Sequence, residues 1–292
     1  MVTGTQSSGQ GHETSFAQVI ADRLGVIPEE VDLISGDTRR VVSGGGSHSD
    51  RSMRLGGALM VQASAEIVER ARNALAAHLE VDAEAIGFAD GLFAAPASNR
   101  TFSLYDVARL MRGGTLPEAH SGALTATASF RGRIPAFPTG AAVCELEVDP
   151  DTGQIEITRY ASIDDVGQPI NPLILHGQVH GGIVQGVGQA LGEAIAIEAS
   201  SGQVQTGSFM DYAMVRAGDM PCFDVDLVED PTHGNPLRVK GGGESGITPA
   251  LATVMNALMD ALAPFEIEHI DMPATPARVW SAIQQAKETP DG

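Results

Sequence analysis

The sequence predicts a mixed α+β protein built in two lobes, on three observations. Segments with helical apolar spacing alternate with segments of strand-like alternation along the chain. Apolar residues make up 43% and charged residues 19%, as in ordinary folded proteins. No repeat of 20–50 residues and no long linker separates independent domains. We expect the first lobe to cover residues 1–118 and the second to cover 119–292.

Apolar spacing and capping signals predict five helices. Residues 12–24 form an apolar face that closes at Gly25, and the Ala-rich stretch 52–79 is a longer helix. A third helix follows Pro172 over 173–193. Another runs over 249–262, with Thr248 as its N-cap and Pro249 at its first position. The last helix covers 275–287.

Alternation of apolar and polar residues predicts the strands. The best supported are 141–149 and 154–163, which the turn at 149–153 joins as a hairpin. Four further strands are expected at 31–37, 123–130, 223–229 and 265–271.

Charge and cysteine content exclude several classes of protein. The chain carries 37 acidic and 18 basic residues, a net charge of −19, which disfavours nucleic acid or an anionic membrane as the main partner. Cys144 and Cys222 form no CxxC pattern, which argues against a disulfide scaffold, a four-cysteine iron–sulfur cluster or a zinc ribbon in this chain. We expect no membrane span and no signal peptide, and hence a cytoplasmic location.

Glycine accounts for 34 of the 292 residues and is clustered. Each cluster borders a helix or a strand, unlike the glycines of a flexible linker. Such positions let the main chain approach a ligand closely. We therefore expect several loops that press backbone amides against a bound group.

Two of these loops precede helices. The first, TGTQSSGQGHET over 3–14, places a glycine turn at a helix N-terminus, which suits an anion such as phosphate. It lacks the GK[ST] of a Walker A motif, and a tight strand–helix connection is the alternative. The second, SGGGSHSDRS over 43–52, can wrap a polar ligand with main-chain and hydroxyl donors, or can be a flexible surface loop.

The segment HGQVHGGIVQGVGQ over 176–189 is an unusual helix, because each interior glycine costs about 1 kcal/mol relative to alanine. Gln178, Gln185 and Gln189 share one face and offer amide donors and acceptors. His176 and His180 have a spacing that can chelate a metal. No carboxylate or cysteine nearby completes such a site, so we expect no protein ligand to a metal.

The segment KGGGESG over 240–246 holds Glu244 on a glycine loop before a helix. A carboxylate in this position can serve as a general base. It can also simply complement the helix dipole.

Taken together and in this order, the motifs resemble one family. SSGQGHET, SGDT, FPTGAAVCELEVDPDTGQIEITRY, INPLILHGQVHGGIVQGVGQAL, TGSFMDY, NPLRVKGGGESG and HIDMPATPARVW are similar to the molybdenum-binding large subunit of the molybdenum hydroxylases. That family includes xanthine dehydrogenases, aldehyde oxidases and carbon monoxide dehydrogenases. The resemblance covers residues 3 to 284 and implies the two-lobed molybdopterin-binding fold of this family.

The resemblance implies a molybdenum–molybdopterin cofactor, usually the cytosine dinucleotide form in bacteria. It implies Glu244 as the base beside the molybdenum and Gln178 as a hydrogen-bonding partner of the pterin. The other cofactor-binding positions that it implies are Gln10, Gly11, His12, Ser47, His48, Ser49, Asp50, Arg51, Ser52 and Gly243. The expected reaction is oxidative hydroxylation of an aldehyde or an N-heteroaromatic carbon with water as the oxygen source, and carbon monoxide is a less favoured substrate.

The chain also departs from the family pattern. The family's large subunit is much longer, and neither its GGGFG-type turn nor its substrate-side loop is found here. The chain therefore resembles only the C-terminal half, and we expect a partner chain to supply the N-terminal half. Iron–sulfur clusters and FAD are expected on further subunits. The alternatives are a non-catalytic scaffold paralogue or fragment, and a stand-alone nucleotide-binding protein that uses the same glycine loops.

Overall fold

The computed structural model describes residues 1–41, 44–95 and 99–288. It has mixed α+β architecture, as predicted, and divides into two compact units. The first unit comprises residues 1–136 and 231–239, and the second comprises 137–230 and 240–292. The boundary between the units thus follows residue 136 rather than 118, and the chain returns once to the first unit.

The first unit is built on helix α2 (Ala58–Leu79), which a π-helical turn (Ser52–Gly57) precedes. A cluster of buried residues, with Leu75, Phe93 and Val107 at its centre, joins α2 to a small antiparallel sheet and to α3. The remaining elements of this unit are β1 (Val2–Thr3), α1 (His12–Leu24), β2 (Ile34–Ser35), β3 (Gly87–Ala89), β4 (Leu92–Ala95), β5 (Arg100–Ser103) and α3 (Leu104–Arg112). Short 3-10 turns lie at Pro28–Glu30, Ala83–Ala85 and Glu118–His120.

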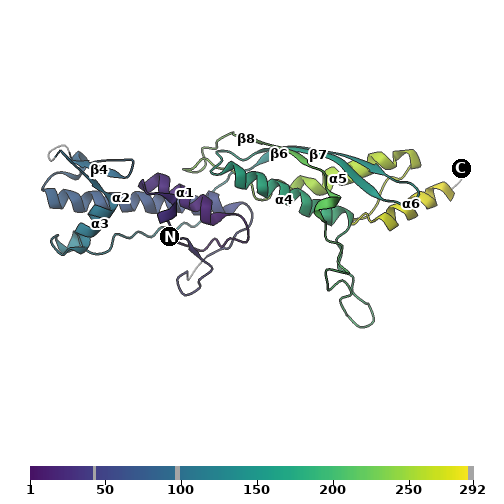
Figure 1. The fold of residues 1–292 in the computed structure, drawn as a ribbon, viewed down its shortest axis with the longest axis horizontal. Helices are drawn as coiled ribbons and strands as arrows, with labels where there is room; N and C mark the ends of the chain where they lie inside the picture. The colour runs from purple at the N-terminus through teal and green to yellow at the C-terminus, as the bar shows by residue number, and fades with distance from the viewer. Residues whose placement is uncertain (42–43, 96–98, 289–292) are drawn as a thin grey trace. The chain divides into compact units, whose positions relative to one another are not determined.

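The second unit is a three-stranded sheet with helices on one face (Figure 1). Strands β6 (Thr139–Val148) and β7 (Ile155–Asp165) form the predicted antiparallel hairpin, and β8 (Phe223–Val228) pairs in parallel with β7. Helices α4 (Pro172–Leu191) and α5 (Ile247–Leu262) pack on the sheet through a shared core, and α6 (Pro276–Glu288) packs on a second core with the end of α5. Two 3-10 turns complete the unit, at Ala217–Asp219 and Ala263–Phe265.

Three of the expected elements differ from those observed. Residues 123–130 and 265–271 form no strand, although both alternate in sequence. The expected strand at 31–37 is reduced to the two residues of β2, which pair in parallel with β1. Alternation was therefore not sufficient, because a strand forms only where a neighbouring strand offers its hydrogen-bonding edge.

No helix in the described part of the chain is long and apolar enough to cross a membrane.

Candidate functional site

The first unit brings the two glycine-rich loops of the N-terminal region together. A Cβ placed on Gly4 would lie 2.6 Å from the Cα of Gly44, so the two backbones are in direct contact. The hydroxyl of Ser47 donates to the carbonyl of Gln6 at 2.5 Å. Segments that are about 40 residues apart in sequence therefore form one surface, as expected if both contact the same ligand.

The first loop turns tightly into α1. Gly11 is the N-cap, with φ of 67° in the left-handed region, and it offers no capping side chain to the first amides of the helix. The Oε1 atom of Gln10 accepts from the backbone amide of Ser8 at 2.5 Å, which holds the turn in shape. The N-terminal amides of α1 therefore receive no hydrogen bond from an N-cap side chain, and they lie at the positive end of the helix dipole.

The imidazole of His12 points into the first unit and not toward a ligand. It is 4% exposed, stacks on Phe16 with ring centroids 4.4 Å apart, and its Nδ1 atom lies 3.1 Å from the carbonyl oxygen of Thr5. Burial lowers the pKa of His12, against the opposing effects of the Thr5 carbonyl and Glu13. The neutral ring therefore donates to Thr5, and the main chain is what this residue can offer to a cofactor.

The second loop is held by two arginines. Arg51 donates from Nη1 to the carbonyl of Gly46 at 2.7 Å, and Arg54 donates from Nη2 to the carbonyl of Ser49 at 3.1 Å. Ser49 and Asp50 both have positive φ, at 50° and 54°, a conformation that is strained for residues with a side chain. Such strain is often found at binding loops. Ser43, the expected start of this loop, lies outside the described residues.

In the second unit, the backbone of the Glu244 loop lies in direct contact with the backbone of α4. A Cβ on Gly182 would lie 2.8 Å from the amide nitrogen of Ile247, and a Cβ on Gly246 would lie 2.1 Å from the carbonyl oxygen of Val179. Only glycine fits at both positions. Val179, which follows Gln178 on α4, thus contacts Gly246, which lies two residues after Glu244. Gln178 and Glu244 are therefore on adjoining segments.

The three glutamines of α4 are not equivalent. Gln178 is half-buried, whereas Gln185 and Gln189 are exposed. This difference supports Gln178 alone as the member of the row near the Glu244 loop. The rings of His176 and His180 lie edge to face with their centroids 6.5 Å apart, and the ring of His180 also lies edge to face with Phe223. Within the described residues, no group of three or more His, Cys, Asp or Glu side chains could hold a metal ion.

Glu244 is exposed, and the residue that follows it is not. The hydroxyl of Ser245 is buried and has no hydrogen-bonding partner among the described residues. An unpaired polar atom in this position fits a polar ligand that would complete its hydrogen bonds. Thr248 is not the N-cap of α5 as expected: the helix begins at Ile247, and the Thr248 hydroxyl donates to the carbonyl of Glu244 at 2.8 Å.

An ion pair that the sequence motifs did not predict anchors the start of the Glu244 loop. The ammonium of Lys240 contacts Asp165 at the end of β7 and also lies 3.0 Å from Asp230. The Lys240 and Asp165 side chains are only 13% and 14% exposed. Asp165, followed by Asp230, raises the pKa of Lys240, so the lysine remains charged. In the sequence, only the position of Lys240 immediately before three glycines pointed to this ion pair. Its acidic partners could not be identified, because they lie 75 and 10 residues away.

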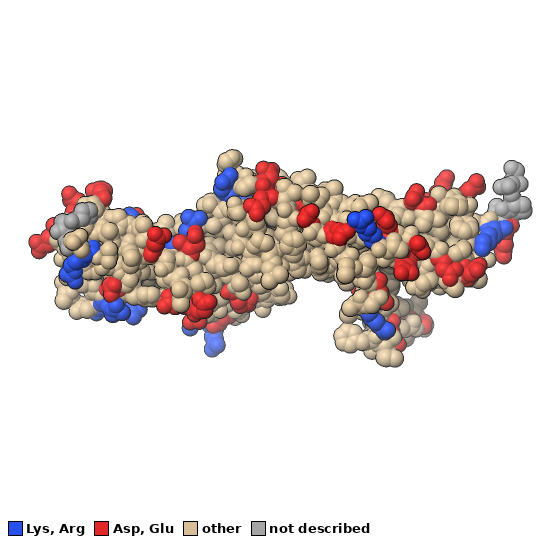
Figure 2. Space-filling model, turned by 45° about the horizontal axis from the view of Figure 1, so that its top comes forward, with Lys and Arg blue, Asp and Glu red and all other residues tan. Residues whose placement is uncertain are grey.

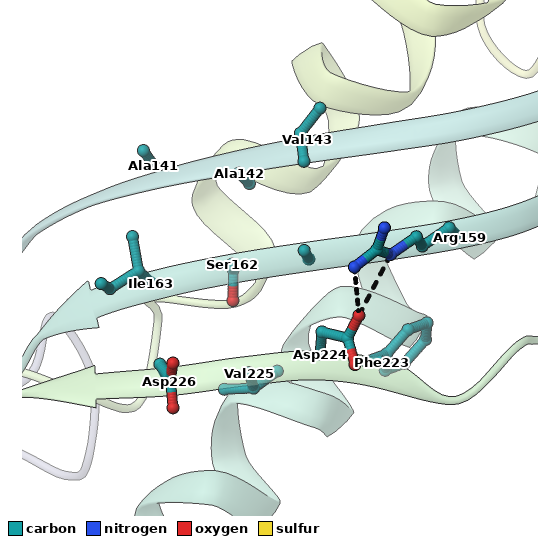
Figure 3. Close-up of a pocket in the computed structure, with 11 residues that line it drawn as sticks. Ala141, Ala142, Val143, Arg159, Ser162, Ile163, Phe223, Asp224, Val225 and Asp226 are labelled. Carbon is teal, nitrogen blue, oxygen red and sulfur yellow. Dashed lines mark hydrogen bonds and ion pairs between the residues drawn. The ribbon is translucent and has the colours of Figure 1, made fainter.

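A surface hollow of about 780 Å³ lies elsewhere in the second unit, on the face of the sheet (Figure 3). Small and apolar residues such as Ala141, Val143 and Ile163 line it, and Arg159 pairs with Asp224 beside them at 3.1 Å. None of the predicted site residues lines this hollow. The candidate site is therefore distinct from this hollow and is built from backbone-rich loops.

Each unit by itself offers groups that suit an anionic ligand held by hydrogen bonds. The first unit offers a helix N-terminus and a strained loop with arginines, which suit a pyrophosphate group. The second unit offers an amide, an unpaired hydroxyl and a carboxylate. A molybdopterin dinucleotide offers partners to hydrogen-bond donors and acceptors of these kinds.

Comparison with known proteins identifies the family. A family model described as molybdopterin cofactor-binding domain matches residues 1–221. The chain belongs to this family. The resemblance to the large subunit of molybdenum hydroxylases is thereby confirmed.

Individual relatives are dehydrogenases and hydroxylases. The chain is 36% identical to the gamma subunit of the 6-hydroxypseudooxynicotine dehydrogenase complex of Paenarthrobacter nicotinovorans, over 97% of the chain and 36% of the relative. It is 30% identical to the carbon monoxide dehydrogenase large chain of Hydrogenophaga pseudoflava, over 97% of the chain and 35% of the relative. The chain thus spans about a third of the length of the relatives that it matches.

Solved structures agree with this assignment. The Cu,Mo-CO dehydrogenase superimposes with a TM-score of 0.87 and 31% identity, over 98% of this chain and 36% of that one. Quinoline 2-oxidoreductase from Pseudomonas putida 86 gives a TM-score of 0.85 and 33% identity, over 97% of this chain and 36% of that one.

The contact between α4 and the Glu244 loop predicts opposite effects for two neighbouring glycines. Gly182→Ala should destabilise the protein by at least about 2 kcal/mol, because the new methyl group overlaps the backbone at Ile247. Gly181→Ala is the matched control: nothing lies within 4 Å of its Cβ, so higher helix propensity should stabilise the protein by up to about 1 kcal/mol. Urea unfolding measures both, and equal effects would contradict the close approach.

The buried histidine predicts a pH-dependent contribution to stability. The pKa of His12 is lower in the folded state than its usual 6.5, so the unfolded chain binds this proton more readily. Its stabilising effect is complete above pH 6.5 and is lost as the pH falls through the folded-state pKa. The Tm advantage of the wild type over His12→Phe should therefore shrink between pH 8 and pH 5 in thermal unfolding. An advantage that is constant or that grows in acid would show that the ring is not held neutral.

Proposed function

We propose that this chain binds a molybdopterin dinucleotide cofactor within a molybdenum hydroxylase and contributes Glu244 as its general base. The observation that carries the proposal is the contact of Gly182 with the loop that bears Glu244, because it joins the Gln178 helix to the carboxylate segment. The family membership supports the choice of cofactor.

Each unit has its own part in holding the cofactor. The loops at Gln10–His12 and Ser47–Ser52 bind the dinucleotide phosphates and pterin through main-chain amides, hydroxyls and Arg51. Gln178 donates to and accepts from the pterin, and Gly243, next to Glu244, contributes its backbone to the same ligand. The buried Ser245 hydroxyl gains the partner that it lacks within the described chain.

Glu244 is the group that moves a proton. When bound, the molybdenum cofactor supplies a two-electron redox centre. The carboxylate of Glu244 accepts the proton released as water is incorporated into the substrate, and Lys240 and the α4 contact hold its loop in position.

The names of the relatives support the choice of reaction class. Their printed names describe a nicotine 6-hydroxylase, a quinoline 2-oxidoreductase and carbon monoxide dehydrogenases. We propose oxidative hydroxylation of an aldehyde or an N-heteroaromatic carbon, with electrons passed to partner iron–sulfur and FAD subunits. A further polypeptide, equivalent to the two-thirds of the relatives that this chain does not cover, completes the substrate pocket.

Cofactor binding predicts a difference between two glutamines of one helix. Gln178→Leu should lower the molybdenum and nucleotide content of the complex purified from its host about tenfold, since it removes hydrogen bonds to the pterin. Gln185→Leu, two turns further along α4 and exposed, should leave both contents unchanged. Elemental analysis and quantification of acid-released nucleotide measure them. A full cofactor load in both variants would refute the assigned role of Gln178.

The general base predicts loss of turnover without loss of cofactor. Glu244→Gln keeps the shape of the side chain but cannot accept a proton at neutral pH, so kcat of the assembled enzyme should fall about 10²- to 10⁴-fold. Molybdenum content should stay at the wild-type level. Glu147→Gln, on an exposed position of β6, is the control and should have full activity. Unchanged turnover in Glu244→Gln would favour the non-catalytic scaffold instead.

A further inference from the structure

A projecting hairpin follows helix α4 in the second unit, and the proposed function does not use it. Figure 1 shows it as the green loop that extends away from the sheet and the helices. Ile197 and Val204 form its β-bridge, and the amide of Glu198 donates to the carbonyl of Gln203 at 2.9 Å. The segment TGSFMDY over 206–212, one of the family motifs, forms its returning arm.

The hairpin exposes more large apolar side chain than a solvated loop requires. Phe209 and Met210 are 83% and 93% exposed. The other exposed apolar residues of the hairpin are Ile195, Ile197, Val204 and Met214. Figure 2 shows the projection as mostly uncharged surface. Single exposed apolar residues are common, but six of them within 20 residues indicate an interaction surface.

The base of the hairpin is tied to α4. The hydroxyl of Tyr212 donates to Glu193 at 2.9 Å, and a Cβ on Gly188 would meet the side chains of Glu193 and Val215 within 3 Å. At the far end of the returning arm, the Ser208 hydroxyl donates to Asp211 at 2.6 Å. The apolar side chains are therefore presented by an anchored, hydrogen-bonded element and not by a loose tether.

We propose that the hairpin at 195–214, in the subunit of the proposed function, docks the chain onto the polypeptide that corresponds to the remaining two-thirds of its relatives. The relatives extend well beyond this chain, which covers 36% of the 6-hydroxypseudooxynicotine dehydrogenase subunit. The hairpin is the element whose exposed apolar side chains a contact with this polypeptide would cover.

The charge of the hairpin specifies the chemistry of the docking surface. Residues 195–214 contain two acidic residues, Glu198 and Asp211, and no Lys or Arg. The complementary surface is therefore an apolar groove with a basic rim. A second copy of this chain fits less well, because it would bring the same acidic residues together between two molecules of net charge −19.

The test compares a hairpin variant with a control of equal exposure. The double variant Phe209→Ser, Met210→Ser removes the two most exposed side chains of the hairpin. Leu173→Ser, 82% exposed at the start of α4, is the matched control. Each tagged chain is produced in its own host, and the polypeptides that co-purify with it are sized and identified by peptide mass.

The wild type and Leu173→Ser should each recover the matching polypeptide one to one. The double variant should recover at least about tenfold less of this polypeptide, because burial of a Phe side chain raises affinity by at least that factor. In the wild-type complex, residues 195–214 should exchange amide hydrogen more slowly than in the chain alone. Equal recovery by the double variant and the wild type overturns the proposal, and so does unchanged exchange.

Two further outcomes separate docking from catalysis and from self-association. If the hairpin controls assembly but the complex has no molybdenum, the docking proposal holds and the proposed function fails. If the double variant still forms a molybdenum-loaded, active complex, the proposed function holds and the docking proposal fails. A dimer of this chain, detected by light scattering and lost in the double variant, would overturn the proposal in favour of a second copy.

Discussion

The close approach of Gly182 on α4 to Gly246 and Ile247 is the contact on which the second unit depends. Interior glycines weaken a helix by about 1 kcal/mol each. For Gly182 and Gly186 the structure gives the reason: a Cβ at either position would overlap the loop or α5. On the buried side of the same helix, Val179, Ile183 and Val187 pack into the core beneath the sheet. One helix thus joins the sheet, the Glu244 loop and the start of α5, and it carries Gln178 between them.

In the first unit, glycines also allow two backbone segments to approach closely. Gly4 and Gly44 allow two loops to lie backbone against backbone, and Ser47 links them by a hydrogen bond to Gln6. In both units, glycine removes side-chain bulk so that main-chain groups from distant segments form one surface. A surface of that kind suits a long polar cofactor, which needs many modest hydrogen bonds along its length rather than a single deep hollow.

The electrostatics of the site are local and differ from the acidic average of the chain. Arg51 lies in the loop assigned to the dinucleotide, and Arg54 in the π-helical turn that follows donates to this loop. Lys240 is held charged between two aspartates at the start of the Glu244 loop. The partly buried Lys240–Asp165 pair positions the loop, and with Asp230 the group brings no excess positive charge to the start of this loop. The proposed proton acceptor therefore remains the exposed carboxylate, next to a buried hydroxyl that has no hydrogen-bonding partner among the residues that the structure describes.

Sequence alone determined the features that depend on neighbouring residues. Apolar spacing predicted α1, α2, α4, α5 and α6, and the turn at 149–153 predicted the β6–β7 hairpin. The glycine loops and the order of motifs indicated the family, which the comparisons confirmed. These inferences succeeded because helical period, turn chemistry and motif spacing are properties of short segments.

Tertiary structure decided whatever required a distant partner. The alternating segments 123–130 and 265–271 found no neighbouring edge and formed no strand, whereas Ile34 and Ser35 paired with residues 32 positions earlier. The inward orientation of His12, the pairing of Lys240 with Asp165 and the return of 231–239 to the first unit were likewise not predictable from local pattern. Each of these depends on a contact between residues far apart in sequence, and only the folded chain specifies which of them meet.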